Sequence, residues 1–187
     1  EGLVRPDLFI PFAEHSGLIV PMTRSLMEQT AQALVPHAAD FTEGFHIGIN
    51  ITASHCQDLE LVKDCSEFLD AFEPGSIHLV LELTESAFMN EVVTALDILI
   101  RLRMNGIELS IDDFGTGYSS LAQLQRIPFT ELKIDRRFIA NFLHEAESQA
   151  IVETCINLAH KMHIRTVAEG VETAETLQAL QAIGCDY

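Results

Sequence analysis

Residues 107–121 read IELSIDDFGTGYSSL, and this stretch decides the fold. Apolar and polar residues alternate up to Asp112, which predicts a strand with one apolar face. Asp112 and Asp113 are adjacent carboxylates that repel each other, so a fold that aims both at one point needs cations there. Their oxygen atoms suit Mg²⁺ or Mn²⁺. Gly115 and Gly117 allow a sharp turn after the strand. For the aspartate pair taken alone, a solvated acidic loop is the simpler interpretation.

Five segments of the chain show this period-2 alternation and are rich in β-branched residues. They are Phe45–Ile51, Ile77–Leu83, Ile107–Asp113, Glu131–Asp135 and Ile164–Glu169. Helices are expected between and around them, near 55–72, 91–105, 147–162 and 174–183, with two more over Asp7–His15 and from Pro21 to about Val35. Strands that alternate with helices predict a parallel sheet with helical crossovers.

Three sites carry helix-end signals. Residues 54–57 read Ser-His-Cys-Gln, the capping-box pattern, and predict that a helix starts there. Thr173 is expected to cap the last helix, and Gly184 to end it.

Each predicted strand has one apolar and one polar face. Parallel sheets covered by helices on both faces read as continuous apolar runs, so this alternation favours a barrel with a polar interior. The polar residues nearest the carboxyl ends of the strands are Asn50, Glu82, Asp112, Lys133 with Asp135, and Glu169. They are expected to converge at one mouth. A lower layer of His46, His78, Glu108 and Arg165 is expected to form a structural hydrogen-bonded network.

Composition narrows the class of protein further. The chain has 187 residues, enough for one domain with a sizeable core. Its formal net charge of −17 argues against binding of a nucleic acid polymer through a basic face. No apolar run approaches the ~18 residues of a membrane span. The four cysteines are scattered, which predicts free thiols in a reducing compartment. We therefore expect a cytoplasmic domain, alone or as the cytoplasmic part of a membrane-anchored protein.

Several blocks of the chain resemble the signatures of the EAL domain family, the bacterial cyclic di-GMP phosphodiesterases. The blocks are LELTES at 81–86, DDFGTGYSSL at 112–121, LKID at 132–135 and AEGVET at 168–173. Asn50-Ile51-Thr52 and residues 12–19 also fit. The resemblance covers essentially the whole chain in the right order, and the 112–121 block is the most specific part of it.

The chain departs from the family pattern in two places. The Glu-Ala-Leu tripeptide that names the family, whose glutamate is a metal ligand there, would precede Glu1. The last family strand, with a Gln-Gly-Tyr segment, would follow Tyr187. The resemblance therefore implies an α/β fold, a TIM-type barrel with about five of its eight strands present. Residues 1–187 are expected to be an EAL domain without its first strands and its last strand, and to be inactive on their own.

The resemblance implies hydrolysis of cyclic di-GMP to linear pGpG with two divalent cations, Mg²⁺ or Mn²⁺. Carried over from the family, Asn50, Glu82 and Asp112 hold one cation. Asp112 bridges to the second cation, which Asp113 also binds. Lys133 steadies the attacking water or the phosphoryl charge, and Glu169 is a metal ligand or a general base.

Three further acidic residues receive smaller roles. Glu85 resembles the family's anchor for the loop 114–121. Asp135 is assigned an auxiliary role beside Lys133, and Glu172 a structural one.

Two other functions remain open at this point. A receptor of the same fold would bind cyclic di-GMP without cleaving it, but such receptors usually lose several acidic ligands, which this chain keeps. An unrelated metal-using barrel enzyme, such as an enolising one, could also use carboxylates at strand ends. The turn at 115–117 lacks the Gly-Lys-Ser/Thr of a phosphate loop and is rejected as a nucleotide cradle.

The family often pairs through the region after the Asp-Asp strand, so a homodimer is expected. Tyr118 and Leu121 would supply apolar contact there, and burial of both against their own barrel is the equal alternative. Sensory or GGDEF-type domains are expected as neighbours in the full-length protein.

Overall fold

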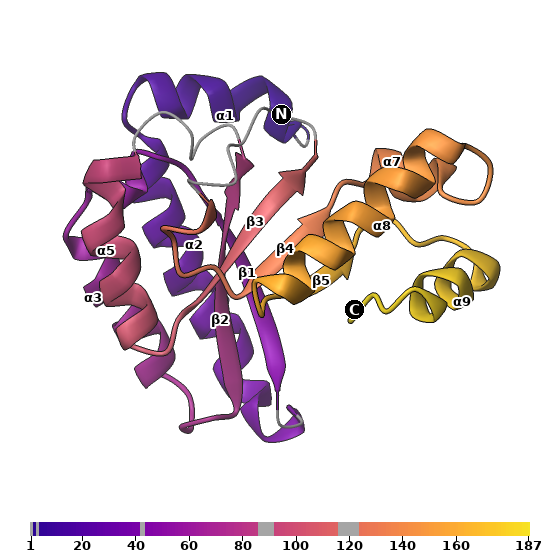
Figure 1. Ribbon diagram of the computed structural model, residues 1–187. Helices are drawn as coiled ribbons and strands as arrows, with labels where there is room; N and C mark the ends of the chain where they lie inside the picture. The colour runs from indigo at the N-terminus through magenta and orange to yellow at the C-terminus, as the bar shows by residue number, and fades with distance from the viewer. Residues whose placement is uncertain (1, 3, 42–43, 86–91, 116–123) are drawn as a thin grey trace.

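Five parallel strands lie side by side in chain order in the computed structural model of the protein, which describes residues 2, 4–41, 44–85, 92–115 and 124–187. The strands are β1 (Phe45–Ile51), β2 (Ile77–Thr84), β3 (Glu108–Phe114), β4 (Glu131–Ile134) and β5 (Arg165–Ala168). All five lie where the alternation predicts them. Because every pair is parallel, all the carboxyl ends meet at one edge of the sheet (Figure 1).

Helical segments connect and cover these strands. They are α1 (Pro6–His15), α2 (Ile19–Leu34), η1 (Val35–Asp40), η2 (His55–Gln57), α3 (Glu60–Asp70), α5 (Val92–Met104), α7 (Arg136–Asn141), α8 (Ala146–Lys161) and α9 (Ala174–Ala182). In Figure 1, α2, α3 and α5 lie together on one side of β1 and β2, and α8 runs along β4 and β5. The α/β class is confirmed, and the order of the strands is that of a TIM-type barrel segment.

Two helix starts differ from the prediction. Ser54 makes no side-chain cap, because its backbone is helical (φ −61°, ψ −34°) rather than extended as an N-cap requires. The chain forms the short 3-10 turn η2 instead, and α3 begins only at Glu60, whose N–H donates to Asp58 Oδ1 at 3.0 Å. Helix α2 starts at Ile19, with Pro21 inside its first turn, where a missing N–H costs no hydrogen bond.

Both ends of the last helix carry the predicted residues. The Thr173 side chain accepts a hydrogen bond from Thr176 N at 3.1 Å and caps α9. Gly184 follows the helix with φ +86°, a conformation that glycine adopts without steric cost.

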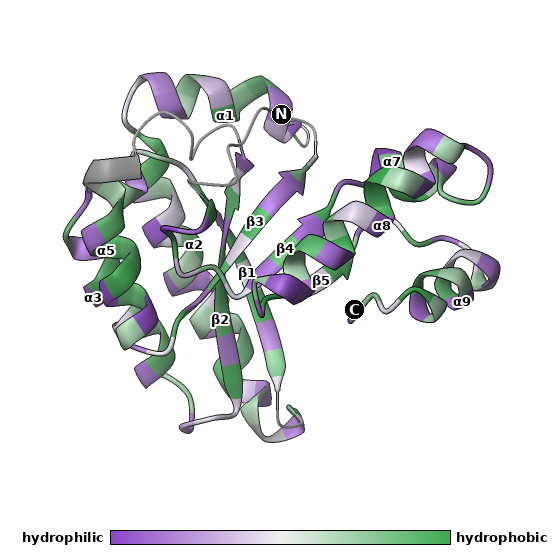
Figure 2. Cartoon of the chain, in the orientation of Figure 1, coloured by the Kyte–Doolittle hydropathy of each residue, from purple (hydrophilic) through white to green (hydrophobic). Residues whose placement is uncertain are grey.

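The apolar faces of the strands form the core beneath the helices. Leu81, Leu109, Ile111, Leu132 and Ile134 are fully buried. Figure 2 shows the resulting alternation of hydrophobic and hydrophilic colour along the strands. Burial of these side chains stabilises the sheet against the helices and leaves the polar residues on its other face.

The lower polar layer forms a contact network, as expected. The rings of His46 and His78 stack with centroids 4.9 Å apart, and His78 Nδ1 lies 3.3 Å from Glu108 Oε1. Arg165 pairs with Glu108, and its Nη2 lies 3.8 Å from Glu131 Oε2. The sequence prediction left Glu131 out of this network.

The chain continues the sheet beyond β5. Tyr187 N donates to Thr166 O at 3.0 Å, and Ala168 N donates to Tyr187 O at 2.9 Å. The Asp186 carboxylate accepts from both the backbone N–H and the hydroxyl of Thr166, each at 2.8 Å. These bonds give partners to backbone N–H and C=O groups of β5 that face away from β4.

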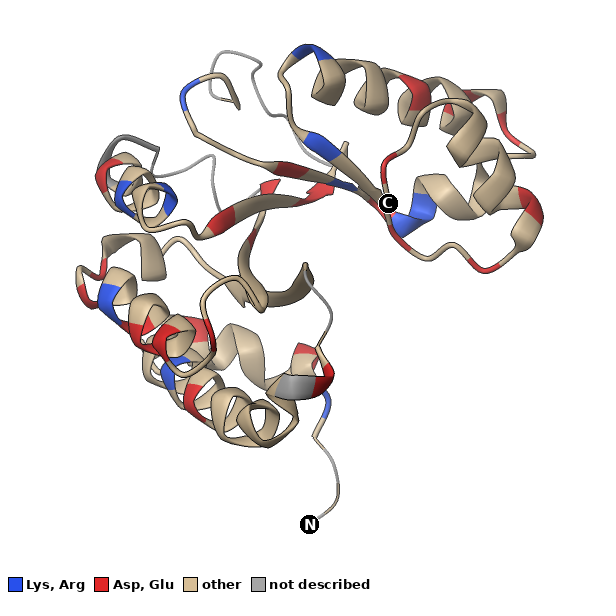
Figure 3. Cartoon of the chain, turned by 90° about the horizontal axis from the view of Figure 1, so that it is seen from below, with Lys and Arg blue, Asp and Glu red and all other residues tan. Residues whose placement is uncertain are grey.

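Acidic residues outnumber basic ones, with 28 Asp and Glu against 11 Lys and Arg. Figure 3 shows Asp and Glu on most helices, interrupted by short segments of Lys and Arg. Within the described ranges, none of the helices has both the length and the apolar character needed to span a membrane.

Candidate functional site

Lys133 is the centre of the polar cluster at the carboxyl ends of the strands. Its ammonium nitrogen lies 2.9 Å from Glu82 Oε2, 3.4 Å from Asp112 Oδ1 and 2.6 Å from Glu169 Oε1. The four residues come from β4, β2, β3 and the segment just after β5. The Lys133 side chain is only 13% exposed. Burial lowers the pKa of this ammonium, but hydrogen bonds to Glu169 and Glu82 outweigh burial and hold the pKa above its ordinary value.

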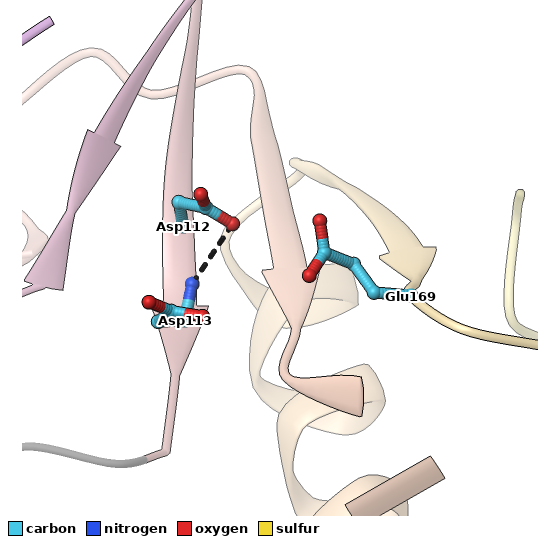
Figure 4. Close-up of side chains that lie close together, drawn as sticks. All are labelled: Asp112, Asp113 and Glu169. Atoms are coloured by element: carbon cyan, nitrogen blue, oxygen red, sulfur yellow. Dashed lines mark hydrogen bonds between the residues drawn. The ribbon is translucent and has the colours of Figure 1, made fainter. Parts of the chain in front are cut away.

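Asp112, Asp113 and Glu169 form a group of three carboxylates at this cluster (Figure 4). Each offers a carboxylate oxygen, and these oxygens lie within 4.8 Å of one another. Glu169 N donates to Ile134 O at 3.2 Å, which continues the β4–β5 pairing and places Glu169 above β4. Asp113 N donates to Asp112 Oδ1 at 3.0 Å.

An unusual backbone conformation brings both aspartates to this cluster. Successive residues of a regular strand point to opposite faces, so one of the pair would point away. Asp113 has φ +56°, in the left-handed region that aspartate tolerates better than most residues. The pairing of β3 with β4 also shifts between Ile111 and Phe114. The strand therefore breaks its alternation at the point where two adjacent carboxylates are needed on one side.

Crowding of negative charge affects the ionisation of Asp113. Burial raises the pKa of this carboxyl, and the charges of Asp112, Asp135 and Glu169 raise it further. A divalent cation among these oxygens would relieve the repulsion. The donors are all oxygen atoms, which fits a hard cation such as Mg²⁺ or Mn²⁺.

The other two predicted ligands, Asn50 and Glu82, lie at the same mouth. Asn50 and Glu82 are partners in the β1–β2 register, so their Cα atoms are neighbours at the mouth. Asn50 is exposed, and the Glu82 carboxylate contacts Lys133. It is Glu169 that joins Asp112 and Asp113 in the three-carboxylate group.

Glu85 links the end of β2 to the turn after β3. Its side chain is almost fully buried, at 2% exposure, and its Oε2 accepts a hydrogen bond from Gly115 N at 3.1 Å. Gly115 has φ +96°, which only glycine adopts readily. The rest of the predicted loop 114–121, including Tyr118 and Leu121, lies outside the described residues.

Asp135 has a structural role that the sequence analysis did not predict. It is the N-cap of the short helix α7, and its Oδ1 accepts from Arg137 N at 2.6 Å. Arg137 Nη2 also donates to Asp135 Oδ2 at 2.9 Å, and these hydrogen bonds hold the pKa of Asp135 below its usual range. Asp135 also interacts with Asp113, so it lies at the border of the cluster. An aspartate directly before a helical run is a known cap signal, but α7 is too short to show periodicity.

Comparison with known proteins places this arrangement in a family. The model of the EAL domain family matches residues 1–187. The chain is 44% identical over 179 residues to the probable cyclic di-GMP phosphodiesterase PdeG of Escherichia coli strain K12, covering 96% of this chain and 35% of that protein. It is 41% identical over 186 residues to the cyclic di-GMP phosphodiesterase PdeL of the same strain, covering 100% of this chain and 51% of that protein.

A solved structure agrees with the sequence comparison. The chain superposes on PaMucR phosphodiesterase in its c-di-GMP complex with a TM-score of 0.87 and 37% identity, covering 100% of this chain and 75% of that one. The chain spans about a third of the length of PdeG and about half of the length of PdeL. The superposition agrees with the fold described above, and the chain belongs to the EAL domain family.

Proposed function

We propose that this chain is the catalytic domain of a phosphodiesterase that hydrolyses one phosphodiester bond of cyclic di-GMP and releases linear pGpG. One observation carries the proposal. Three carboxylates, Asp112, Asp113 and Glu169, bring oxygen atoms within 4.8 Å of one another beside the Lys133 ammonium. The names of PdeG, PdeL and PaMucR as phosphodiesterases support the same reaction.

The acidic residues would hold two divalent cations, Mg²⁺ or Mn²⁺. Asp112, Asp113 and Glu169 would hold one cation, and Asn50 and Glu82 together with Asp112 would hold the other. Two bound cations supply an activated water and stabilise the leaving oxygen of an anionic diester. Within the cluster, Glu169 acts as a ligand in this proposal, because its oxygen belongs to the same group as the aspartates.

Lys133 has a separate task. Its ammonium stays charged at neutral pH, since its pKa lies above the ordinary value. It donates toward the developing negative charge on the phosphoryl oxygens. Glu85 keeps the turn after β3 in place through Gly115 and does no chemistry itself.

The test is hydrolysis by the full-length protein, with pGpG separated from cyclic di-GMP by anion-exchange chromatography. We expect turnover with Mg²⁺ or Mn²⁺, little with Ca²⁺ because its coordination is longer and looser, and none with a chelator. Asp112→Asn should remove most of the activity. Asp97→Asn is the matched control, because Asp97 lies on α5 and pairs with Arg101 at the surface, away from the strand ends. Tight binding of cyclic di-GMP without any product would favour the receptor alternative, and turnover in the chelator would overturn the metal mechanism.

We also propose that the active protein is a two-fold homodimer. The proposal rests on the resemblance of residues 112–121 to the family segment that meets a second copy. Light scattering on the full-length protein at micromolar concentration tests it, and a monomer at all concentrations would refute it.

A further inference from the structure

The Glu82 carboxylate occupies a position that only a glycine at residue 48 permits. A Cβ added to Gly48 would lie 2.3 Å from Glu82 Oε1 and 3.1 Å from Glu82 Cδ. Glu82 pairs in register with Asn50, and Gly48 precedes Asn50 by two residues on the same face of β1. The Glu82 side chain therefore leans toward β1 and back from the mouth, and from there its Oε2 contacts Lys133 Nζ at 2.9 Å.

Ser110 flanks Glu82 on the opposite side. It is the β3 partner of Glu82 in the β2–β3 register, and it shares a face of β3 with Asp112. Ser110 is fully buried. Its Oγ has no hydrogen-bond partner among the described residues. A buried hydroxyl without a partner is unfavourable, so a conformation that brings an acceptor to Ser110 has a local advantage.

These two observations fit one conformational change. We propose that Glu82 has two positions, one over Gly48 and paired with Lys133, the other turned toward β3, where Ser110 Oγ donates to it and its free oxygen faces the cation site beside Asp112. Gly48 and Ser110 are positioning residues in this scheme. Gly48 makes room for the first position, and Ser110 stabilises the second.

The balance between the two positions controls the affinity for a divalent cation. In the first position Glu82 is engaged by Lys133 and lies outside the group of Asp112, Asp113 and Glu169. The apparent affinity of a ligand falls in proportion to the fraction of the protein in the competent conformation. This inference rests on the proposed function, because it assumes that Glu82 is a cation ligand.

Two substitutions shift the balance in opposite directions. Gly48→Ala closes the first position, and the change is mild for folding because the clashing atoms are the end of a flexible side chain. The methyl group lies on the β1 side, so Glu82 must turn toward β3. Ser110→Ala removes the donor that stabilises the second position without changing any charge.

The experiment is a Mn²⁺ titration by isothermal calorimetry on the full-length protein, without substrate. We expect Gly48→Ala to tighten Mn²⁺ binding and Ser110→Ala to weaken it, each by about threefold to tenfold, the net effect of one ordinary hydrogen bond. Both effects should vanish in a Glu82→Gln background. Matched controls are Gly2→Ala, where the added Cβ meets nothing within 4 Å, and Ser66→Ala, whose hydroxyl donates to Val62 O within α3.

The outcomes separate this inference from the proposed function. Unchanged affinity in either variant, two changes of the same sign, or effects that persist with Glu82→Gln would overturn the two-position scheme alone. Absence of Mn²⁺ binding by the unmodified protein would overturn the scheme and the metal-dependent function together.

Discussion

Lys133 Nζ lies 2.6 Å from Glu169 Oε1 and connects the inner face of β4 to the segment that follows β5. The same nitrogen contacts Glu82 and Asp112. One ammonium thus balances three carboxylates that arrive from three other parts of the sheet. Because the Lys133 side chain is mostly buried, water cannot replace this compensation fully.

Lys133→Met should destabilise the fold as well as impair turnover. Removal of the ammonium leaves Glu82, Asp112 and Glu169 without their shared counter-ion, and the free energy of unfolding should fall by about 3 kcal/mol. Saturating Mg²⁺ should restore part of this loss. Urea denaturation with and without Mg²⁺ measures both effects.

Lys63→Met serves as the control for that experiment. Lys63 is an exposed lysine of α3 that lies 3.7 Å from Glu60 and 3.6 Å from Glu67. Its removal should change the unfolding free energy by less than about 0.5 kcal/mol. Equal losses from the two lysines would show that the central ammonium has no special structural role.

Asp113→Asn should raise stability while it weakens cation binding. The fold raises the pKa of Asp113, so the ionised carboxylate is disfavoured in the folded state. The resulting loss of stability appears as the pH rises through about 3.9, the pKa of an aspartate in the unfolded chain, and it persists at neutral pH. The neutral amide should therefore add stability at pH 7, by less than about 1 kcal/mol because solvent screens this partly exposed carboxylate. Asparagine also tolerates the left-handed backbone at this position.

The pH dependence gives the check on this prediction. The stability advantage of Asp113→Asn should shrink at pH values below about 3.9, where the aspartate of the unmodified protein is protonated in both states. Thermal unfolding curves at pH 3 and pH 7 measure the difference. An advantage of the same size at both pH values would rule out charge repulsion as its cause.

Glu85→Ala should loosen the turn after β3. The substitution removes the acceptor of the Gly115 N–H and leaves space in a buried site, so stability should fall by about 2 kcal/mol. Glu85→Gln keeps an acceptor oxygen and should lose less. Hydrogen exchange of the Gly115 amide, followed by NMR, should be slowest in the unmodified protein, faster in Glu85→Gln and fastest in Glu85→Ala. Identical exchange rates in all three proteins would contradict the anchoring role.

Asp135→Ala should remove the cap of α7, whereas Asp135→Asn should keep most of it. Loss of an N-cap costs about 1 kcal/mol, and asparagine caps nearly as well as aspartate. The Arg137 partner lowers the pKa of Asp135, so its charge stabilises the fold above about pH 3.9, and this contribution is lost as the pH falls through the lowered pKa. Denaturation of both variants across pH 2–7 separates the cap from the charge. A larger loss for asparagine than for alanine would contradict the capping assignment.

Much of the fold was predictable because the burial of one strand face appears in the sequence as a regular alternation of apolar and polar residues. A residue such as Leu81 or Leu109 points to the helices because every second residue of a strand shares a face, and that period is readable without coordinates. Helix α7 was not predictable in the same way, since six residues give less than two turns of periodicity. The error at Ser54 arose because its backbone conformation depends on the η2 turn and not on the capping pattern.

The sequence by itself determined which acidic residues stand at the carboxyl ends of the strands, because strand phase is a property of neighbouring residues. It also determined membership of the EAL domain family through blocks such as residues 112–121. Only the tertiary structure decided that Glu169 joins the two aspartates, that Glu82 rests over Gly48, and that Asp113 turns its backbone to φ +56°. These relations depend on side chains brought together from distant segments, and their balance of repulsion, burial and hydrogen bonding exists only once the strands are paired.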